Sequence, residues 1–455
     1  MVSISIENFR SFEKEQTLSL VASRRYSGAH DGHALAIPNS EERVLKTAVM
    51  YGANGAGKSN IFKALKYLRS IAIEVRKKNS GTGREPFRFG DNSNKFSTFS
   101  VQFIANENLY EFGVKVDDVR VAQEWLMKID GSKEKNIYER ITDDNGRVVI
   151  ESDFFKKDGG KVAALATVGG PQNQSFLATI IATLEEEDIG AEILSIIDWF
   201  SATLKLIEPN QSIAPLGHLL STDDKFLKFA GDFLKSSSTG VDYLDVKKQE
   251  ITEDELLAAL PERLAKKLFE DMSSTDNNTA IVHMGDGNEL LVERTDENHY
   301  YRVTIQGAHR CSTGSSVSLD LSEESDGTRR LLNLIPALNH PNDGAVYFID
   351  EIDRSMHPML IWKFLEFFLT SCKADRHQIV VTTHESNLLD LELLRRDEIW
   401  FVEKDQDAAT NLYPLTDFKV RKDLEIRKHY LEGRFGAVPF LGSLNQLLEE
   451  RTLSA

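Results

Sequence analysis

"AVMYGANGAGKSNIFKALKYL", residues 48–68, is the stretch that decides the fold of this chain. An apolar segment leads into a glycine-rich turn, and after it Ile61, Leu65, Leu68 and Ile71 recur at helical spacing. This order predicts a buried strand over residues 44–52, a tight loop, and a helix that begins at the end of the loop.

The glycine-rich turn has the composition of a phosphate-binding loop. Gly52, Gly55 and Gly57 can adopt backbone angles that other residues avoid, so the chain can close around an anion with its N–H groups pointing inward. Lys58 and Ser59 complete the spacing G-x-x-x-x-G-K-S, in which the lysine reaches the β- and γ-phosphates and the serine hydroxyl binds Mg²⁺. The helix N-terminus also favours negative charge. The strand, loop and helix together therefore indicate a nucleotide site, and an ordinary glycine-rich loop is the weaker interpretation.

Length and composition set the class of protein. The 455 residues allow two or three domains, and the 41% hydrophobic content allows substantial cores. No apolar run approaches the ~20 residues of a membrane span, and the first residues lack the order of a signal peptide, so we expect a cytoplasmic protein with no membrane partner. Cys311 and Cys372 are too few for a disulfide framework or a zinc cluster. The net charge of −17 argues against non-specific coating of nucleic acid, although a local basic groove stays compatible with it.

The order of patterns along the chain predicts three parts. Residues 2–9 and 16–22 alternate like strands, residues 96–129 read as three strands with a hairpin turn at 106–108, and residues 176–275 read mainly as helices. The last of these helices opens with a Thr252/Glu255 capping box and carries an expected kink at Pro261. Strands resume over residues 279–306, and helix and strand alternate beyond residue 320.

We therefore expect an α/β fold in which the two ends of the chain build one sheet with helices on both faces. Residues 1–130 and 311–455 would form this domain, around a central insertion over residues 131–310 that is largely helical with some strands. Residues 79–83 and 273–278 have the composition of flexible linkers.

A second apolar strand supplies acids for the same site. "GAVYFIDEID", residues 344–353, ends in Asp350 and Glu351. Strands of α/β sheets present ligands at their carboxyl ends, so these acids are expected beside the phosphate loop. Asp350 is the residue type that holds Mg²⁺, and Glu351 is placed to orient or deprotonate an attacking water. Alone, such a strand end is usually only solvated, and its combination with the loop is what favours a site.

Two further segments offer polar groups. "IVVTTHESNLL", residues 379–389, contains a strand that ends in His384, which can donate to a γ-phosphate oxygen, although a locally satisfied histidine is the plainer alternative. "LSEESDGTRRLLNL", residues 321–334, places Ser325 and Gly327 at the start of a helix, where both suit close approach to phosphate oxygens. Taken alone, Ser325 is more typical of a helix cap.

With these motifs in order, the chain resembles the ABC-type ATPase heads shared by chromosome-maintenance and double-strand-break-repair proteins. The resemblance rests on "IENFRSF" (6–12), "GANGAGKS" (52–59), "ESDGTRR" at the position of an LSGGQ-like helix start, "VYFIDE", "IDRSMHP" and "TTH". The chain is more closely similar to the bacterial AAA15-type ATPases of phage-defence and abortive-infection loci, the RloA-like group, through "SFEKEQTLSLVAS", "YGANGAGKSN", "DEIDRSMHP" and "YLEGRFGAVPF" (430–440).

The resemblance implies roles for particular residues toward ATP and Mg²⁺. Asp350 and Ser59 would hold the metal, and Glu351, His384 and Lys58 would be the catalytic base, the switch histidine and the phosphate-loop lysine. Ser325 and Gly327 would contact the γ-phosphate of ATP that a second subunit holds. The remaining cofactor-binding positions would be Arg10, Gly52, Asn54, Gly55, Ala56, Gly57 and Asn60.

Two features depart from the family pattern. Asp326 replaces the first glycine of the helix start and Thr328 replaces its Gln or Glu, and an acid beside a γ-phosphate repels it unless it points away. The glutamine loop has no clear position. Gln102 is its candidate, and an ordinary strand residue is the equal alternative.

The resemblance implies an ATPase in which two subunits sandwich two ATP molecules, as a dimer or a higher homo-oligomer, and control a separate effector, such as a co-encoded nuclease, in defence against phage. Two alternatives stay open: a repair or recombination head that clamps DNA when ATP closes the dimer, and a scaffold whose bound ATP is scarcely hydrolysed. "FVEKDQD" (401–407) resembles the opening of a Toprim nuclease, but we prefer a solvated strand end because no D-x-D follows on a later strand.

Overall fold

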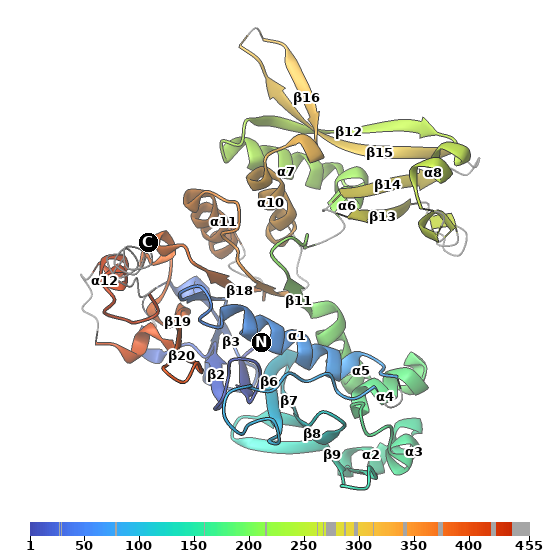
Figure 1. Cartoon of the computed structure of the whole chain (residues 1–455), viewed down its shortest axis with the longest axis vertical. Coiled ribbons are helices and arrows are strands. Elements are labelled where there is room, and N and C mark those ends of the chain that lie inside the picture. Colours follow the sequence, from blue (N-terminus) through green and yellow to red (C-terminus); the bar gives the residue numbers. More distant parts are fainter. Residues whose placement is uncertain are drawn as a thin grey trace, which may run out of the picture. The chain divides into compact units, whose positions relative to one another are not determined.

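The structure is a computed structural model, and it describes residues 1–26, 28, 30–77, 80–158, 160–213, 216–261, 263–266, 268–269, 279–285, 288–294, 299–312, 314–339, 344–371, 376–419 and 425–438. The chain forms two compact units, which are described separately. The first consists of Met1–Leu206, Gly344–Glu351 and Arg376–Ala455, and the second of Ile207–Asp343 and Ile352–Asp375. Figure 1 shows the elements of both units.

A six-stranded sheet in the first unit carries the predicted phosphate loop. Its order is β11-β17-β18-β5-β19-β20, in which β17, β18, β5 and β19 are parallel and β20 is antiparallel to β19. The strands are β5 (Thr47–Tyr51), β11 (Leu204–Ile207), β17 (Val346–Ile349), β18 (Gln378–Thr383), β19 (Ile399–Lys404) and β20 (Thr410–Pro414). Strands from both ends of the chain thus share one sheet, as predicted, and β17, β18 and β5 end at the same edge.

A second sheet of the first unit is antiparallel throughout, with the order β10-β9-β8-β7-β6-β1-β2. The strands are β1 (Ser3–Glu7), β2 (Gln16–Ser19), β6 (Ser97–Ala105), β7 (Asn108–Val116), β8 (Val121–Asp130), β9 (Lys133–Thr142) and β10 (Val148–Glu151). The predicted hairpin turn is confirmed, because Asn106 and Glu107 join β6 to β7 with φ of 42° and 60°. β3 (Ala34–Ala36) and β4 (Arg43–Leu45) form a short two-stranded ladder of their own.

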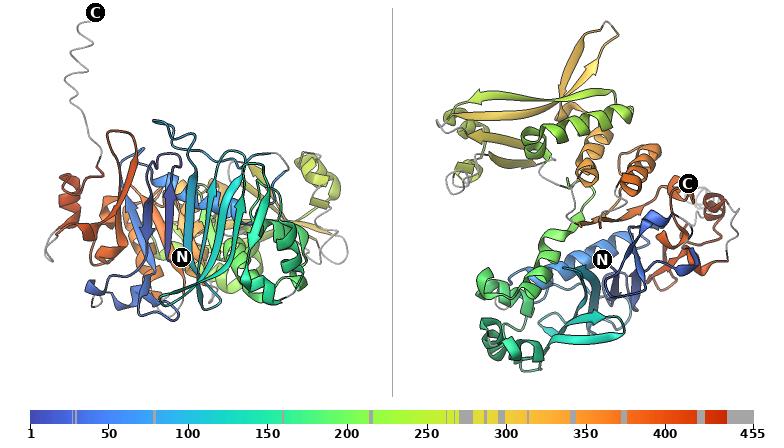
Figure 2. Two further views of the ribbon diagram at one scale, coloured as in Figure 1. Left: turned by 90° about the horizontal axis from the view of Figure 1, so that it is seen from below. Right: turned by 180° about the vertical axis from the view of Figure 1, so that it is seen from behind.

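Helix α1 (Lys58–Ile73) packs against both sheets. The four apolar residues predicted to face the core, Ile61, Leu65, Leu68 and Ile71, are fully buried in one cluster that includes side chains of β1, β6, β17 and β19. On the other face of the parallel sheet, Tyr430 of α12 (Ile426–Leu431) stacks on Phe401 of β19 with ring centroids 5.7 Å apart. Helices therefore cover both faces, and the predicted α/β class with flanking helices is confirmed (Figure 2). Among the described residues, the other α-helices of this unit are α2 (Asp153–Asp158), α3 (Lys161–Val168), α4 (Phe176–Thr183) and α5 (Ala191–Asp198).

The second unit has its own antiparallel sheet, in which β12-β15-β14-β13 are neighbours in that order and β16 also pairs with β15. The strands are β12 (Val241–Ile251), β13 (Thr279–Gly285), β14 (Asn288–Arg294), β15 (Tyr300–Arg310) and β16 (Ser316–Asp320). Its described helices include α6 (Leu216–Thr222), α7 (Asp224–Ser236), α8 (Glu253–Ala259), α10 (Asp326–Leu334) and α11 (Pro358–Ser371).

Two predictions for this unit are wrong. Residues 241–251, which we expected in a helical region, form the long strand β12, and only Val241 and Leu244 of it are buried. An edge strand with so few buried residues lacks the alternation that marks a half-buried strand. The helix that opens with the Thr252/Glu255 capping box is confirmed, but it ends at Ala259 instead of bending at Pro261. Leu260 is extended, because the residue before a proline avoids helical angles.

The units also differ from the three parts expected from the sequence. The expected boundary near residue 130 falls between β8 and β9, which are paired antiparallel strands of one sheet, and the first unit continues to Leu206. The expected linker at 273–278 lies outside the described residues, as do Asn79 of the other linker and Cys372.

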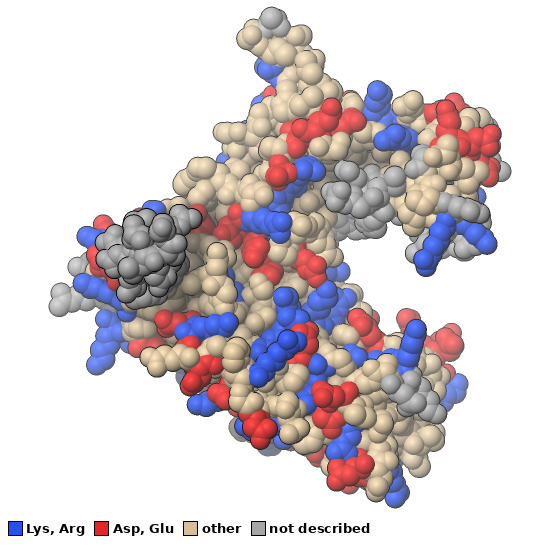
Figure 3. All heavy atoms as spheres, in the orientation of Figure 1, with Lys and Arg blue, Asp and Glu red and all other residues tan. Residues whose placement is uncertain are grey.

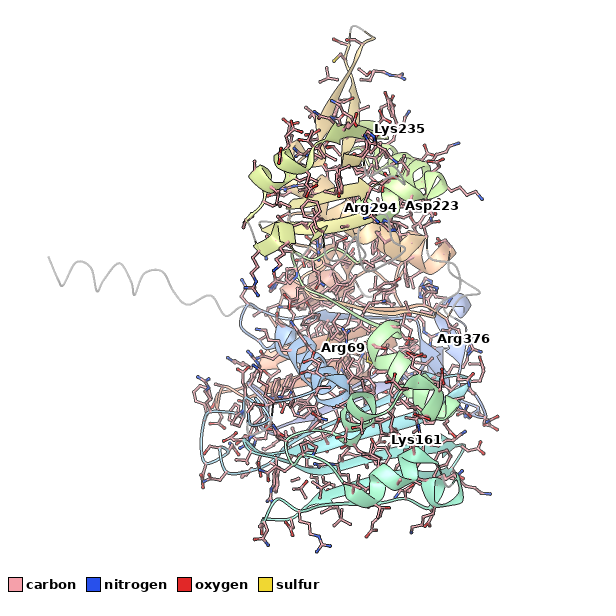
Figure 4. All side chains as sticks on the ribbon, turned by 90° about the vertical axis from the view of Figure 1, so that its right-hand side faces the viewer. Arg69, Lys161, Asp223, Lys235, Arg294 and Arg376 are labelled. Atoms are coloured by element: carbon pink, nitrogen blue, oxygen red, sulfur yellow. The ribbon has the colours of Figure 1, made fainter. Side chains whose placement is uncertain are left out.

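Charged side chains of both signs are interspersed over the face of the molecule in Figure 3. Many form local pairs or caps, such as Lys235 with Asp242 at 2.5 Å, and Asp223, whose side chain caps α7 (Figure 4). Within the described residues, no helix is both long and apolar enough to cross a bilayer.

Candidate active site

The glycines of the loop between β5 and α1 are required either by their backbone angles or by close neighbours. Gly55 and Gly57 have φ of +77° and +115°, which other residues rarely adopt. A Cβ atom on Gly57 would lie 2.2 Å from Thr410 Oγ1, and one on Gly52 would lie 2.4 Å from the carbonyl oxygen of Val402 in β19. Asn54 and Gly55 are exposed at the tip of the loop.

Lys58 is the first residue of α1, and its side chain points back into the loop. The residue is buried there, with only 5% of its surface exposed. Its Nζ donates to the carbonyl oxygens of Gly52 at 2.7 Å and Ala53 at 3.2 Å. His384, directly after β18, brings Nδ1 to 3.1 Å from this Nζ and to 3.2 Å from Gly52 O. The ammonium group can only donate, so in the contact with Lys58 the histidine nitrogen accepts.

Asp350 and Ser59 meet beside the lysine. Asp350 follows β17 and is buried, and its Oδ1 accepts from Ser59 Oγ at 3.2 Å and from Thr382 Oγ1 at 2.6 Å. The Thr382 hydroxyl in turn accepts from the backbone N–H of Glu351 at 2.8 Å. Thr382, in the middle strand β18, thus fixes both acids at the end of β17.

These residues fit a triphosphate and a divalent cation. A serine hydroxyl and a buried carboxylate oxygen in contact are the hard oxygen ligands that Mg²⁺ prefers. The start of a 16-residue helix directly after the loop and the Lys58 ammonium group favour phosphate oxygens. Asp350 and Ser59 would hold the cation, with Thr382 positioning Asp350, and the loop with Lys58 would hold the phosphates.

Three side chains that support the loop or the two acids were not found from the sequence, namely Thr410, Ser11 and Thr382. Thr410 Oγ1 donates to the carbonyl oxygen of Ala56 at 2.7 Å and lies 2.7 Å from Ser11 Oγ, and Asn60 Nδ2 donates to Ser11 Oγ at 2.8 Å. Thr382 is the third. Thr382 could have been noticed as a hydroxyl two positions before His384, whereas Thr410 follows the loop by more than 350 positions and has no local signal.

Arg10 and Gln102 have partners away from the phosphate loop. The guanidinium group of Arg10 pairs with Glu85. The next residue, Ser11, does reach the site, because it contacts Asn60. Gln102 lies within β6, and its Nε2 donates to Glu111 of β7 at 2.9 Å. This favours the ordinary strand residue over the glutamine loop.

Ser325 and Gly327 lie in the second unit at the start of α10. Ser325 is the N-cap, and its Oγ accepts from the Thr328 N–H at 3.1 Å. A Cβ atom on Gly327 would lie 2.7 Å from the carbonyl oxygen of Ser355, so this glycine allows close approach of two backbones. Asp326, which departs from the family pattern, pairs with Arg329 of its own helix. Its negative charge is thereby partly neutralised.

Asp405, in the segment that resembles a Toprim opening, belongs to the turn between β19 and β20. Its Oδ1 accepts from the Ala409 and Asp407 N–H groups at 2.9 and 3.0 Å. The Ala409 hydrogen bond in particular holds the pKa of Asp405 below its usual value. Within the described ranges, no group of three or more histidine, cysteine, aspartate or glutamate side chains is placed to hold a metal ion, and the turn accounts for this acid.

A phosphate loop whose lysine meets a strand-end histidine and whose serine meets a strand-end aspartate defines a P-loop ATPase domain. The chain belongs to the family described as "AAA domain, putative AbiEii toxin, Type IV TA system", whose model matches residues 48–153 and 264–390, just over half of the chain. The predicted relation to AAA-type ATPases is thereby confirmed.

Similar solved structures include SMC heads. The "SmcHead bound to the C-winged helix domain of ScpA" is 13% identical with a TM-score of 0.39, and 90% of this chain and 96% of that chain are covered. The "SMC head domain from Thermotoga maritima" is 11% identical with a TM-score of 0.35, over 91% of this chain and 98% of that chain. A Pyrococcus furiosus Smc head with an extended coiled coil is 10% identical with a TM-score of 0.35, over 90% and 95%. No curated protein sequence matches significantly.

Thr382→Val is expected to impair hydrolysis without unfolding the protein. Valine has the shape of threonine, but its substitution leaves the Glu351 N–H without its partner and removes one hydroxyl from Asp350. An unsatisfied buried polar group costs about 1–3 kcal/mol, so we expect a roughly tenfold or larger fall in kcat, or a matching rise in the Mg²⁺ concentration required. Steady-state hydrolysis over a Mg²⁺ titration measures this. Thr382→Ser, which keeps the hydroxyl, is the control, and wild-type kinetics of the valine variant would contradict the role.

Proposed function

We propose that this protein binds ATP with Mg²⁺ in the first unit and hydrolyses its γ-phosphate bond. One observation carries the proposal: segments 291 and 326 positions apart in the sequence meet through the Ser59–Asp350 and Lys58–His384 contacts. If the acids were only a solvated strand end, or if the loop were an ordinary glycine-rich loop, these contacts would not be needed.

The side chains at the site suit the parts of phosphoryl transfer. Lys58 and the loop N–H groups hold the β- and γ-phosphates, and Ser59 and Asp350 hold Mg²⁺, which supplies positive charge to the phosphate oxygens when bound. Glu351 takes a proton from the attacking water. His384, in contact with Lys58, senses whether the γ-phosphate is present.

The backbone of Glu351 supports a functional role for this residue. Its φ is +48°, a region that non-glycine residues rarely adopt. Such conformations cluster at functional sites, where the surrounding structure holds them. Here the hydrogen bond from the Glu351 N–H to the buried Thr382 hydroxyl holds it. The partly exposed Glu351 side chain is then available to a water at the γ-phosphate.

The protein works as a dimer in this proposal. Ser325 and Gly327 of one subunit contact the γ-phosphate of ATP in the other, so ATP joins the subunits and hydrolysis separates them. The pairing of Asp326 with Arg329 supports this contact, because it lowers the repulsion that a free acid would exert. The dimer controls a separate effector, a nuclease encoded beside it, in defence against phage. The family description, with its reference to a toxin system, supports such a context.

A mixing experiment tests the shared sites. Lys58→Ala removes the phosphate-loop lysine, and Ser325→Asp keeps a good helix cap but places a carboxylate at the γ-phosphate. We expect each variant alone to be inactive and a one-to-one mixture to regain activity. In a mixed dimer, one site combines the intact Lys58 of one subunit with the intact Ser325 of the other. Random pairing makes about a quarter of all sites intact.

Ser325→Asn is the matched control, because it caps the helix equally well without a charge. A mixture as inactive as its components would exclude shared sites. High activity of the purified protein only with DNA would favour the repair head, and ATP binding without turnover would favour the scaffold. Purification with the products of neighbouring genes, followed by assays of DNA and RNA cleavage with and without ATP, tests the effector.

A further inference from the structure

A partly buried hydrogen bond ties the start of α10 to the sheet of the second unit. Glu324 immediately precedes Ser325, the N-cap of α10, and its side chain is only 4% exposed. Its Oε1 lies 2.7 Å from Nε2 of His309 in β15. Because the carboxylate accepts, the ring N–H donates. The bond fixes the backbone next to Ser325 on a strand that lies outside the phosphate site.

Gly307 makes room for this bond. Gly307 and His309 are two positions apart on β15, so they share one face of the strand. A Cβ atom on Gly307 would lie 2.4 Å from Glu324 Oε1, so any side chain there would displace the carboxylate. The position of the Glu324 carboxylate thus depends on Gly307, a glycine that lies within a strand and is not required by a turn.

A second contact holds the same segment at its other end. Gln306 Nε2 donates to Asp320 Oδ1 at 2.7 Å, and Asp320, at the end of β16, forms a capping box with Glu323. Residues 320–325 are therefore attached to β15 through both Asp320 and Glu324. In the first turn of α10, Gly327 lies against the backbone of Ser355. The start of α10 is thus held both by β15 and by the backbone at Ser355; α10, β15 and β16 are labelled in Figure 1.

We propose that His309 is a positioning residue for hydrolysis in the partner subunit. Through Glu324, it holds Ser325 and Gly327 where they reach the γ-phosphate of the other subunit's ATP. This inference rests on the proposed function, and it adds a residue of the β12–β16 sheet to the machinery. If the bond had only a structural role, its loss would lower stability. It would not affect hydrolysis of the partner's nucleotide differently from hydrolysis of the subunit's own nucleotide.

The experiment compares His309→Phe, which keeps a ring but loses the N–H, with His309→Gln, whose amide can still donate. For His309→Phe we expect wild-type affinity for ATP, because the phosphate loop is unchanged, and a kcat at least about tenfold lower. We expect His309→Gln to recover most of the activity. A one-to-one mixture of His309→Phe with Lys58→Ala should regain activity, because one site then combines an intact lysine with an intact histidine.

The outcomes separate this inference from the proposed function. Wild-type kcat of His309→Phe overturns it. A mixture of His309→Phe with Lys58→Ala that stays inactive, while Ser325→Asp with Lys58→Ala recovers, also overturns it and leaves the shared sites intact. If neither mixture recovers activity, the proposal that two subunits share each ATP site is itself excluded.

Gly307→Ala provides an independent variant in case His309→Phe does not fold. It changes neither partner of the hydrogen bond, but its methyl group displaces the Glu324 carboxylate. We expect the same pattern, with unchanged ATP affinity, a lower kcat and recovery by Lys58→Ala in a mixture. Wild-type turnover by Gly307→Ala contradicts the proposal. Thermal unfolding of each variant, with and without ATP, shows that the compared proteins are folded.

Discussion

Lys58→Ala is expected to abolish measurable ATP binding. The ammonium group of Lys58 is buried at the loop, and in the structure it is held by the carbonyl oxygens of Gly52 and Ala53 and by His384. When nucleotide binds, the same donors face phosphate oxygens. Hydrogen bonds between charged groups contribute about 1.5–3 kcal/mol each, so losing two of them weakens binding by roughly a hundredfold or more. Titration of a fluorescent ATP analogue measures the affinity directly.

The control for this variant is Lys63→Ala. Lys63 lies on the same helix but is exposed, so the substitution removes an equal charge away from the loop. It should leave ATP affinity unchanged within about twofold, because exposed charges interact weakly with distant groups. Tight binding by Lys58→Ala would remove the phosphate loop from the nucleotide site and with it the proposed function.

Glu351→Gln is expected to keep ATP bound while hydrolysis nearly stops. Glutamine has the shape of glutamate but cannot accept the proton of the attacking water. General base catalysis contributes about a hundredfold to ten-thousandfold, so we expect kcat to fall by at least about a hundredfold. ATP affinity should be unchanged or higher, since Lys58 and Asp350 are intact. Single-turnover hydrolysis and ATP binding, measured on the same preparation, give both values.

The same variant should accumulate the ATP-bound dimer. If ATP joins the subunits and hydrolysis separates them, a variant that binds without hydrolysing stays closed. Light scattering coupled to gel filtration, with and without ATP and Mg²⁺, measures the mass. Glu392→Gln, at an exposed acid of the first unit, is the control and should hydrolyse normally. Unchanged turnover of Glu351→Gln would exclude Glu351 as the base.

Several parts of the fold could be predicted because their signals are local. The loop glycines, Lys58 and Ser59 lie within a few residues of one another, and the apolar face of α1 has a regular period. The strands that end at Asp350 and His384 are short apolar runs with a polar residue at the end. Local composition is sufficient for such elements, and it also predicted the Thr252 capping box and the turn at Asn106 and Glu107.

The wrong predictions concern segments whose secondary structure depends on pairing with another strand. β12 is an edge strand whose exposed residues satisfy no strand period, so only its pairing with β15 makes it a strand. β9 extends the sheet past the boundary expected near residue 130, because β8 pairs with it. Backbone hydrogen bonds to another strand, rather than side-chain patterns, decided both.

The sequence by itself determined that a phosphate loop and two strand-end polar groups exist, because each is encoded within about ten consecutive residues. Only the tertiary structure decided that β18 lies between β17 and β5, which places Thr382 where it can hold both Asp350 and Glu351. It alone brought Thr410 to the phosphate loop and His309 to Glu324. The reason is that hydrogen bonds between residues far apart in the chain depend on sheet order and side-chain direction, which no short pattern records.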